Sequence, residues 1–111
     1  MIPRRAAALV AAASLAGLTS PAAAADPAQV FVKSCSPCHG KEGEPSAIFV
    51  KQGVRNFKDP AWQKANTDAQ IEQAIRQGKK GTMMASFEKQ LSPEDIKALV
   101  SHIRKLGGAK K

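Results

Sequence analysis

The last third of the chain carries the clearest helical pattern of apolar residues. The apolar positions, which recur three or four residues apart, are Ile96, Leu99, Val100, Ile103 and Leu106. Residues at that spacing lie on one face of a helix. Ser92 suits the N-cap, Pro93 the first helical position and Gly107 the stop, with Arg104 in the last turn. The sequence therefore predicts a helix between Ser92 and Gly107 with one buried face.

Two further helices are predicted upstream of this one. Thr67 and Gln70 have the spacing of a capping box, in which each side chain bonds the backbone N–H of the other residue. The apolar positions that follow at helical spacing are Ile71, Ala74 and Ile75. Gly78 is placed to end that helix. A shorter helix is predicted from Pro27 to about Ser34, because an early proline suits a helix start.

The remainder of the chain is predicted to be loop. No segment alternates apolar and polar residues convincingly over the length of a strand, so we predict an all-α domain. Two long loops are left, residues 40–66 and 78–91. Loops of that length are uncommon in a compact domain unless they carry a function. Wrapping a flat cofactor would give both loops such a function.

The start of the chain has the pattern of a secretory signal peptide. Two arginines precede an alanine-rich apolar run, residues 6–18, that is too short to span a bilayer. Small residues at Ala23–Ala25 then precede Asp26, as a cleavage site requires. We expect residues 1–25 to be removed and residues 26–111 to act in the periplasm without a membrane-spanning segment. A retained amino-terminal anchor is the alternative.

The composition narrows the choice of partners. The chain has 111 residues, 17 Lys and Arg against 9 Asp and Glu, and a formal net charge of +8. Removing residues 1–25 takes away two arginines and no acid, so the charge falls to +6. An exported chain with few aromatic residues and no nucleic-acid-binding motif is not expected to bind nucleic acid. The positive charge suits attraction to an acidic protein surface.

The chain has two cysteines, Cys35 and Cys38, and His39 follows them directly. A redox dithiol, a metal site and a haem attachment all use this spacing. A thioredoxin-like dithiol belongs beside a βαβ unit, and no strands are predicted here. A structural zinc ion needs four ligands, whereas this motif offers three and the other histidine, His102, is far along the last helix.

A haem attachment uses every residue of the motif. On a helical turn the thiols of Cys35 and Cys38 project to one side, where each can add to one vinyl group of a porphyrin. His39 lies four residues after Cys35 on the same side, so its imidazole can reach the iron. Cys-x-x-Cys-His is the signature of c-type haem attachment. We predict one covalent haem c per chain, with Cys35 and Cys38 as thioether residues and His39 as the proximal iron ligand.

The chain resembles the small class I cytochromes c of bacteria over essentially its whole mature length. Phe31 stands four residues before the first cysteine. The stretches that carry the resemblance are CSPCHG at 35–40, DPAW at 59–62, TDAQIEQAIRQG at 67–78, MASF at 84–87 and LSPEDIKALVSHIRKL at 91–106. The resemblance implies the cytochrome c fold, with three to five short helices and long loops wrapped round one haem. It also implies that the first and last helices cross near Phe31.

The second iron ligand is expected in the loop after Gly78. Met83 and Met84 lie side by side in this Gly- and Lys-rich stretch, which lacks the apolar periodicity of a helix core. Similar proteins carry Met-Pro-x-Phe here, and Met84 matches that frame three residues before Phe87, with Ala85 in place of the proline. The resemblance implies Met84 as the distal ligand and Met83 as the alternative. The replaced proline leaves the rigidity of the loop open.

Several residues have supporting roles to be tested. Trp62 is the only tryptophan; its N–H can donate to a haem propionate, and packing within the loop is the alternative. Pro45 is expected near the carbonyl that accepts the second imidazole N–H of His39. His102 is expected at the surface or at an interface, because the family often has an aromatic residue there. Residues expected in the core or against the haem are Phe31, Ile48, Phe57, Ile71, Ile75, Phe87, Leu91, Leu99 and Ile103.

The function predicted from these features is a soluble periplasmic electron carrier and not an enzyme, since no general base stands beside a nucleophile. Lysines near the motif and the methionine loop, Lys41, Lys79 and Lys80, would attract a redox partner with an acidic docking surface. Two alternatives stay open. One is a haem protein with an open or labile sixth position for a small ligand, and the other is a dedicated electron-transfer subunit of an oxidoreductase complex.

Overall fold

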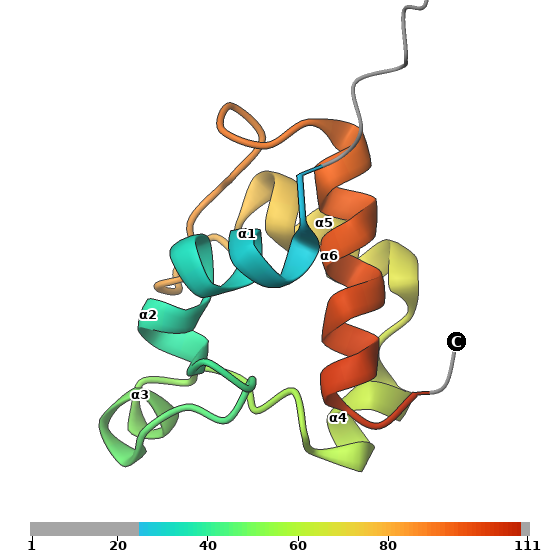
Figure 1. Ribbon diagram of the computed structural model, residues 1–111. Helices are drawn as coiled ribbons and strands as arrows, with labels where there is room; N and C mark the ends of the chain where they lie inside the picture. Colours follow the sequence, from blue (N-terminus) through green and yellow to red (C-terminus); the bar gives the residue numbers. More distant parts are fainter. Residues whose placement is uncertain (1–24, 110–111) are drawn as a thin grey trace, which may run out of the picture.

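The computed structural model describes residues 25–109, which form six helices and no strand (Figure 1). The helices are α1 (Pro27–Ser34), α2 (Ser36–His39), α3 (Ala47–Lys51), α4 (Pro60–Ala65), α5 (Asp68–Gln77) and α6 (Pro93–Leu106). The predicted all-α class is confirmed. The expected number of helices, three to five, is too low, because α2, α3 and α4 are too short to show a helical period. The predicted signal peptide lies outside the described residues, except for Ala25.

The helix ends follow the sequence signals. Thr67 and Gln70 form the predicted capping box at the start of α5, and the Ser92 side chain accepts a hydrogen bond from Asp95 N at the start of α6. The overlooked helix α4 begins in the same way, because Asp59 accepts from Ala61 N and Pro60 takes the first helical position.

The core lies where α1 crosses α6 and where α5 packs against α6 (Figure 1). Its buried residues are Phe31, Cys35, Phe57, Ile71, Ile75, Ile96, Leu99, Val100 and Ile103. Phe31 is fully buried, and the ring of His102 lies 5.1 Å from the Phe31 ring, so this histidine stands at the helix crossing. The placement of Ile48 in the core is wrong: its side chain is 68% exposed, on a helix that buries no residue.

Backbone hydrogen bonds hold two of the segments that connect the helices. The segment between α2 and α4 folds back, because Phe57 N donates to Gly43 O over 2.8 Å. The segment after α5 returns to that helix, because Phe87 N donates to Ile75 O over 2.9 Å. Within residues 25–109 no helix has both the length and the apolar character needed to cross a membrane.

Candidate haem-binding site

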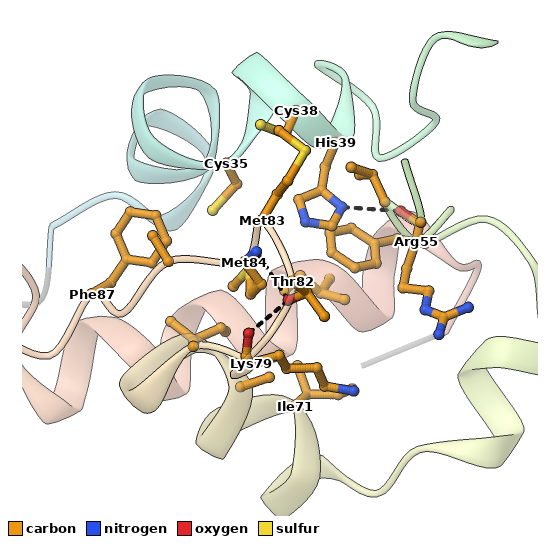
Figure 2. A pocket seen from close by; sticks show the side chains of 18 of the residues that line it. Cys35, Cys38, His39, Arg55, Ile71, Lys79, Thr82, Met83, Met84 and Phe87 are labelled. Atoms are coloured by element: carbon orange, nitrogen blue, oxygen red, sulfur yellow. Dashed lines mark hydrogen bonds between the residues drawn. The ribbon is translucent and has the colours of Figure 1, made fainter. Parts of the chain in front are cut away.

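A cavity of about 460 Å³ opens between the cysteine motif, α5 and the loop that follows α5 (Figure 2). That volume lies in the range of small-molecule and cofactor pockets. The site residues predicted from the sequence that line it are Cys35, Cys38, His39, Trp62, Met83 and Met84. The structure thus brings all six together around one cavity, although they come from three separate parts of the chain.

The cysteine motif forms a tight turn between α1 and α2. Cys35 is both the C-cap of α1 and the N-cap of α2, and its carbonyl accepts from Cys38 N at 3.2 Å and from His39 N at 2.9 Å. Gly40 then turns the chain with φ +80°, where an added Cβ would lie 2.1 Å from Glu44 O. Only glycine fits that position, which ends α2 directly after the histidine.

The Cys35 thiol does not have the property that a reactive redox dithiol needs. Burial raises the pKa of Cys35 to about 11, so its thiol stays protonated at neutral pH. Reactive dithiols depend instead on a lowered thiol pKa. Nor do the described residues bring three His, Cys, Asp or Glu side chains together in a way that could hold a metal ion. These observations weigh against the dithiol and zinc alternatives within residues 25–109.

His39 is oriented from two sides. Its Nδ1 lies 3.0 Å from the carbonyl oxygen of Arg55, which can only accept, so Nδ1 carries the proton and Nε2 keeps a lone pair. Its ring stacks on Phe57 with centroids 4.2 Å apart and planes 16° from parallel. Burial lowers the pKa of His39, which favours the neutral imidazole that binds metals. The accepting carbonyl belongs to Arg55, and the expected position of Pro45 near it stays a prediction.

The methionine loop closes on itself through hydrogen bonds. Lys79 N donates to Met84 O at 3.1 Å, and Met84 N donates to Thr82 Oγ1 at 3.2 Å. Gly78, with φ +70°, permits this closure, because an added Cβ would lie 2.6 Å from Met84 O. These contacts fix the start of the loop without the proline that the resemblance led us to expect.

The two methionines differ in exposure. Met83 is 54% exposed, whereas Met84 is partly buried and packs against the hydrophobic core. The next residues tie the loop to α5, since Ser86 Oγ donates to Arg76 O over 2.6 Å. The exposure difference agrees with Met84 as the residue that faces the haem, and its role as ligand stays a prediction.

Three contributors to the site were not identified from the sequence. The Arg55 carbonyl is a backbone group and leaves no residue signature. Phe57 was expected in the core but not as the stacking partner of His39. Gln63, whose side-chain amide donates to Phe57 O at 2.7 Å, was not singled out at all, and no pattern in the sequence marks it. Trp62 packs 4.9 Å from Phe57 at the cavity, and its contact with a propionate stays a prediction.

The residues present fit a c-type haem. Two thiols lie on one turn, a neutral imidazole follows them, and thioether sulfurs come from another segment of the cavity wall. The charged side chains among the described lining residues are those of Arg55 and Lys79, and no carboxylate is among them. A mainly apolar cavity with two cations suits a flat apolar ring that carries two propionates.

The known proteins that are similar to this chain include long ones, of which it covers only a part, and small ones of about its own length. Residues 22–103 match the family described as cytochrome c oxidase, cbb3-type, subunit III. FixP, a cbb3-type cytochrome c oxidase subunit of Bradyrhizobium diazoefficiens, is 34% identical over 82 residues, which are 74% of this chain and 27% of FixP. Cytochrome c-553 of Nitratidesulfovibrio vulgaris is 35% identical over 95 residues, 85% of this chain and 89% of that protein.

A solved structure is similar as well. The KustC0563 c-type cytochrome superposes with a TM-score of 0.68 at 34% identity, covering 74% of this chain and 98% of that one. The chain spans about a quarter of the length of the FixP proteins that it matches, at 27% and 26%.

Proposed function

The chain belongs to the c-type cytochrome family described as cbb3-type cytochrome c oxidase subunit III, and we propose that it is a periplasmic electron carrier. The predicted family, the cytochrome c fold and the covalently bound haem c are confirmed by the similarities to cytochrome c-553 and to a solved c-type cytochrome. The haem supplies the chemistry, because its iron takes up and releases one electron. The protein orients the haem and sets its surroundings.

In this proposal Cys35 and Cys38 hold the haem through thioether bonds, and His39 and Met84 bind its iron. One observation carries it: the cysteine motif and the methionine loop line the same cavity. The hydrogen bond from His39 Nδ1 to Arg55 O supports the proximal role, because it leaves Nε2 for the metal. Trp62 at the cavity is proposed to donate to a propionate.

Carrier function would follow if both His39 and Met84 bound the iron of the haem. A thioether ligand such as that of Met84 favours the reduced state and leaves no position for a substrate. The exposed lysines Lys41, Lys79 and Lys80 support docking to an acidic surface of a redox partner. Residues 1–25 are proposed to direct export and to be removed.

The test is a visible spectrum of the protein purified from the periplasm, oxidised and reduced, with and without carbon monoxide. We expect a low-spin haem in both states and no carbon monoxide binding at neutral pH. Binding of carbon monoxide by the reduced protein would instead support an open or labile sixth position. Recovery of the protein only from the cytoplasm, with residues 1–25 intact, would contradict export.

A second candidate is an electron-transfer subunit of an oxidase. It is supported by the similarity to FixP, which is a subunit of a cbb3-type cytochrome c oxidase. Affinity purification from native membranes and from the soluble fraction separates the two proposals. A stable monomer in the soluble fraction supports the carrier, whereas stoichiometric recovery with an oxidase supports the subunit.

A further inference from the structure

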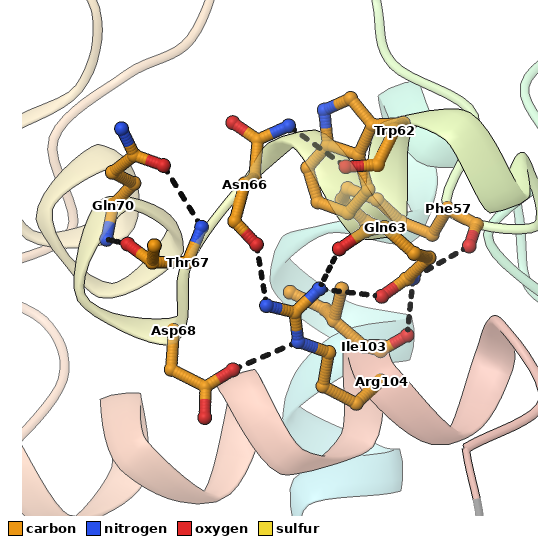
Figure 3. Close-up of polar contacts among 9 residues, drawn as sticks. All are labelled: Phe57, Trp62, Gln63, Asn66, Thr67, Asp68, Gln70, Ile103 and Arg104. Carbon is orange, nitrogen blue, oxygen red and sulfur yellow. Dashed lines mark hydrogen bonds and ion pairs between the residues drawn. The ribbon is translucent and has the colours of Figure 1, made fainter.

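One arginine of the C-terminal helix binds the segment that carries part of the cavity wall. Arg104 lies on α6 outside the cavity lining, and its guanidinium donates four hydrogen bonds (Figure 3). The acceptors and their distances are Gln63 O at 2.7 Å, Gln63 Oε1 at 2.8 Å, Asn66 O at 2.5 Å and Asp68 Oδ1 at 2.8 Å. Three of the four belong to α4 and its exit, so Arg104 binds this segment as a unit.

The ion pair with Asp68 does not explain the arrangement. The Asp68 side chain is 74% exposed, and exposed ion pairs contribute little stability. The Arg104 side chain is only 21% exposed, and its other three bonds are partly buried. A planar guanidinium can serve these separate acceptors together, which a lysine ammonium on a flexible stem cannot match. The contact therefore acts mainly on α4.

Gln63 passes this restraint on to the cavity. Its side-chain amide donates to Phe57 O at 2.7 Å and to Ile103 O at 3.1 Å, while its oxygen accepts from Arg104. Both amide protons are used, so the side chain is fixed between α6 and the backbone of Phe57. Gly107 leaves room for it, because an added Cβ there would lie 2.4 Å from Gln63 Nε2.

The segment that Arg104 and Gln63 hold includes Phe57 and Trp62, which form the cavity wall beside His39. Phe57 is 5% exposed, stacks on His39 and packs on Trp62. Phe57 and Trp62 both line the cavity, and Phe57 N also donates to Gly43 O at 2.8 Å. Gln63 and its helix are thus one of the restraints on these two rings, beside the contacts of Phe57 with Gly43 and Phe31.

We propose that Arg104 and Gln63 are positioning residues, which lock the Phe57–Trp62 wall against α6 and thereby keep water from the haem on the His39 side. This inference rests on the proposed haem site. Water near the iron stabilises the oxidised, more highly charged state, so loosening the wall lowers the reduction potential. Trp62 reports on the wall directly, because it is the only tryptophan and its emission is quenched by a nearby haem.

The experiment uses the full haem-loaded protein and four variants. Arg104→Met removes all four bonds, Arg104→Lys keeps the charge, and Gln63→Glu removes both amide donations while keeping an acceptor for Arg104. Asp68→Asn is the matched control, because it weakens only the exposed ion pair. The measurements are midpoint potential, Trp62 emission and the denaturant concentration at half unfolding.

We expect Arg104→Met and Gln63→Glu to lower the potential and raise Trp62 emission, with Arg104→Lys intermediate and Asp68→Asn unchanged. Because both Arg104→Met and Gln63→Glu also make the net charge one unit more negative, which lowers the potential by itself, Trp62 emission decides. Reduced unfolding midpoints with wild-type emission would overturn the inference, because the residues would then be merely structural. If the Arg104→Met protein does not accumulate, the same measurements on Gln63→Glu test the inference. A wild-type protein without covalent haem would instead refute the haem site itself.

Discussion

The wall of the cavity that carries His39 and the wall that carries Met84 are held by different kinds of interaction. His39 is fixed by the Arg55 carbonyl and by the buried ring of Phe57, which Gln63 ties to α6. Met84 lies in a largely exposed loop, which is closed by hydrogen bonds to Lys79 and Thr82.

This difference has a consequence for stability. Contacts that are buried and shared among several helices open only when the whole domain unfolds, whereas an exposed loop with few apolar contacts opens locally. On the histidine side, the buried Phe57 ring and its link through Gln63 to α6 belong to the first class, and the methionine loop belongs to the second. We therefore expect the methionine side to be released first when the protein is stressed, while the histidine side stays formed.

Removal of both thiols should have the largest effect. In Cys35→Ala/Cys38→Ala no thioether can form, so haem should be lost from the chain on a denaturing gel, where wild type keeps it. Ser36→Ala is the control, because it alters the same turn without removing a thiol. Haem that stays with the double variant after denaturation would show that the attachment lies elsewhere.

Substitution of Met83 or Met84 tests the wall of the cavity that carries Met84. Met84→Ala should lose the sulfur-to-iron absorption band, lower the reduction potential and allow carbon monoxide to bind at neutral pH, because Met ligation favours reduced iron. Met83→Ala, at the 54% exposed neighbour, should keep all three properties. The reverse pattern would assign the ligand to Met83.

Gly78→Ala should weaken the methionine wall alone. Its backbone has φ +70°, which costs about 1–3 kcal/mol for a residue with a side chain, and its Cβ would press on Met84 O. Gly81→Ala is the matched control, because φ is +80° there and no atom lies within 4 Å of an added Cβ.

The measurement for this pair is denaturant titration followed at two signals, the sulfur-to-iron band and far-ultraviolet circular dichroism. Gly78→Ala should lose the band at a lower denaturant concentration than Gly81→Ala does, with a smaller change in the dichroism transition. Equal shifts in both variants would mean that the close approach to Met84 O has no energetic role.

Acid should have the smallest of these effects, and it acts at the crossing of α1 and α6, where His102 packs on Phe31. Burial lowers the pKa of His102, aided by Lys105 and opposed by Asp26. The unfolded state then binds the proton more readily, so stability falls as pH drops below about 6.5, the ordinary histidine value. His102→Phe should flatten this part of the pH profile of unfolding. A profile as steep as that of wild type would exclude His102 as its source.

Much of the fold could be predicted because its signals are local. The sequence predicted the N-caps at Thr67 and Ser92. It also predicted the apolar faces of α5 and α6. The short helices were missed because four to six residues hold too little of a helical period to count. Ile48 was misplaced because an apolar residue in a loop carries no sign of which way it faces.

Some features of the candidate site could likewise be predicted from the sequence, and others could not. The spacing of Cys35, Cys38 and His39 is shared by dithiol, metal and haem sites, and the sequence favoured haem only because it predicted no strands and offered no fourth metal ligand nearby. The partners of His39 could not be predicted, because a backbone carbonyl has no residue signature. In the sequence, Arg104 could be identified only as a basic residue in the last turn of a helix. Its four hydrogen-bond acceptors lie far from it along the chain.

The chemistry of this protein could be predicted from its sequence, because haem attachment, helix capping and the apolar faces depend on residues within a few positions of one another. How the residues of the site are held depends on the packing of the folded chain. This packing set the Phe57 ring against the imidazole, closed the Met84 loop without a proline, and joined α4 to α6 through Arg104. Each of these contacts pairs groups that no local pattern links, so chain packing alone brings them together.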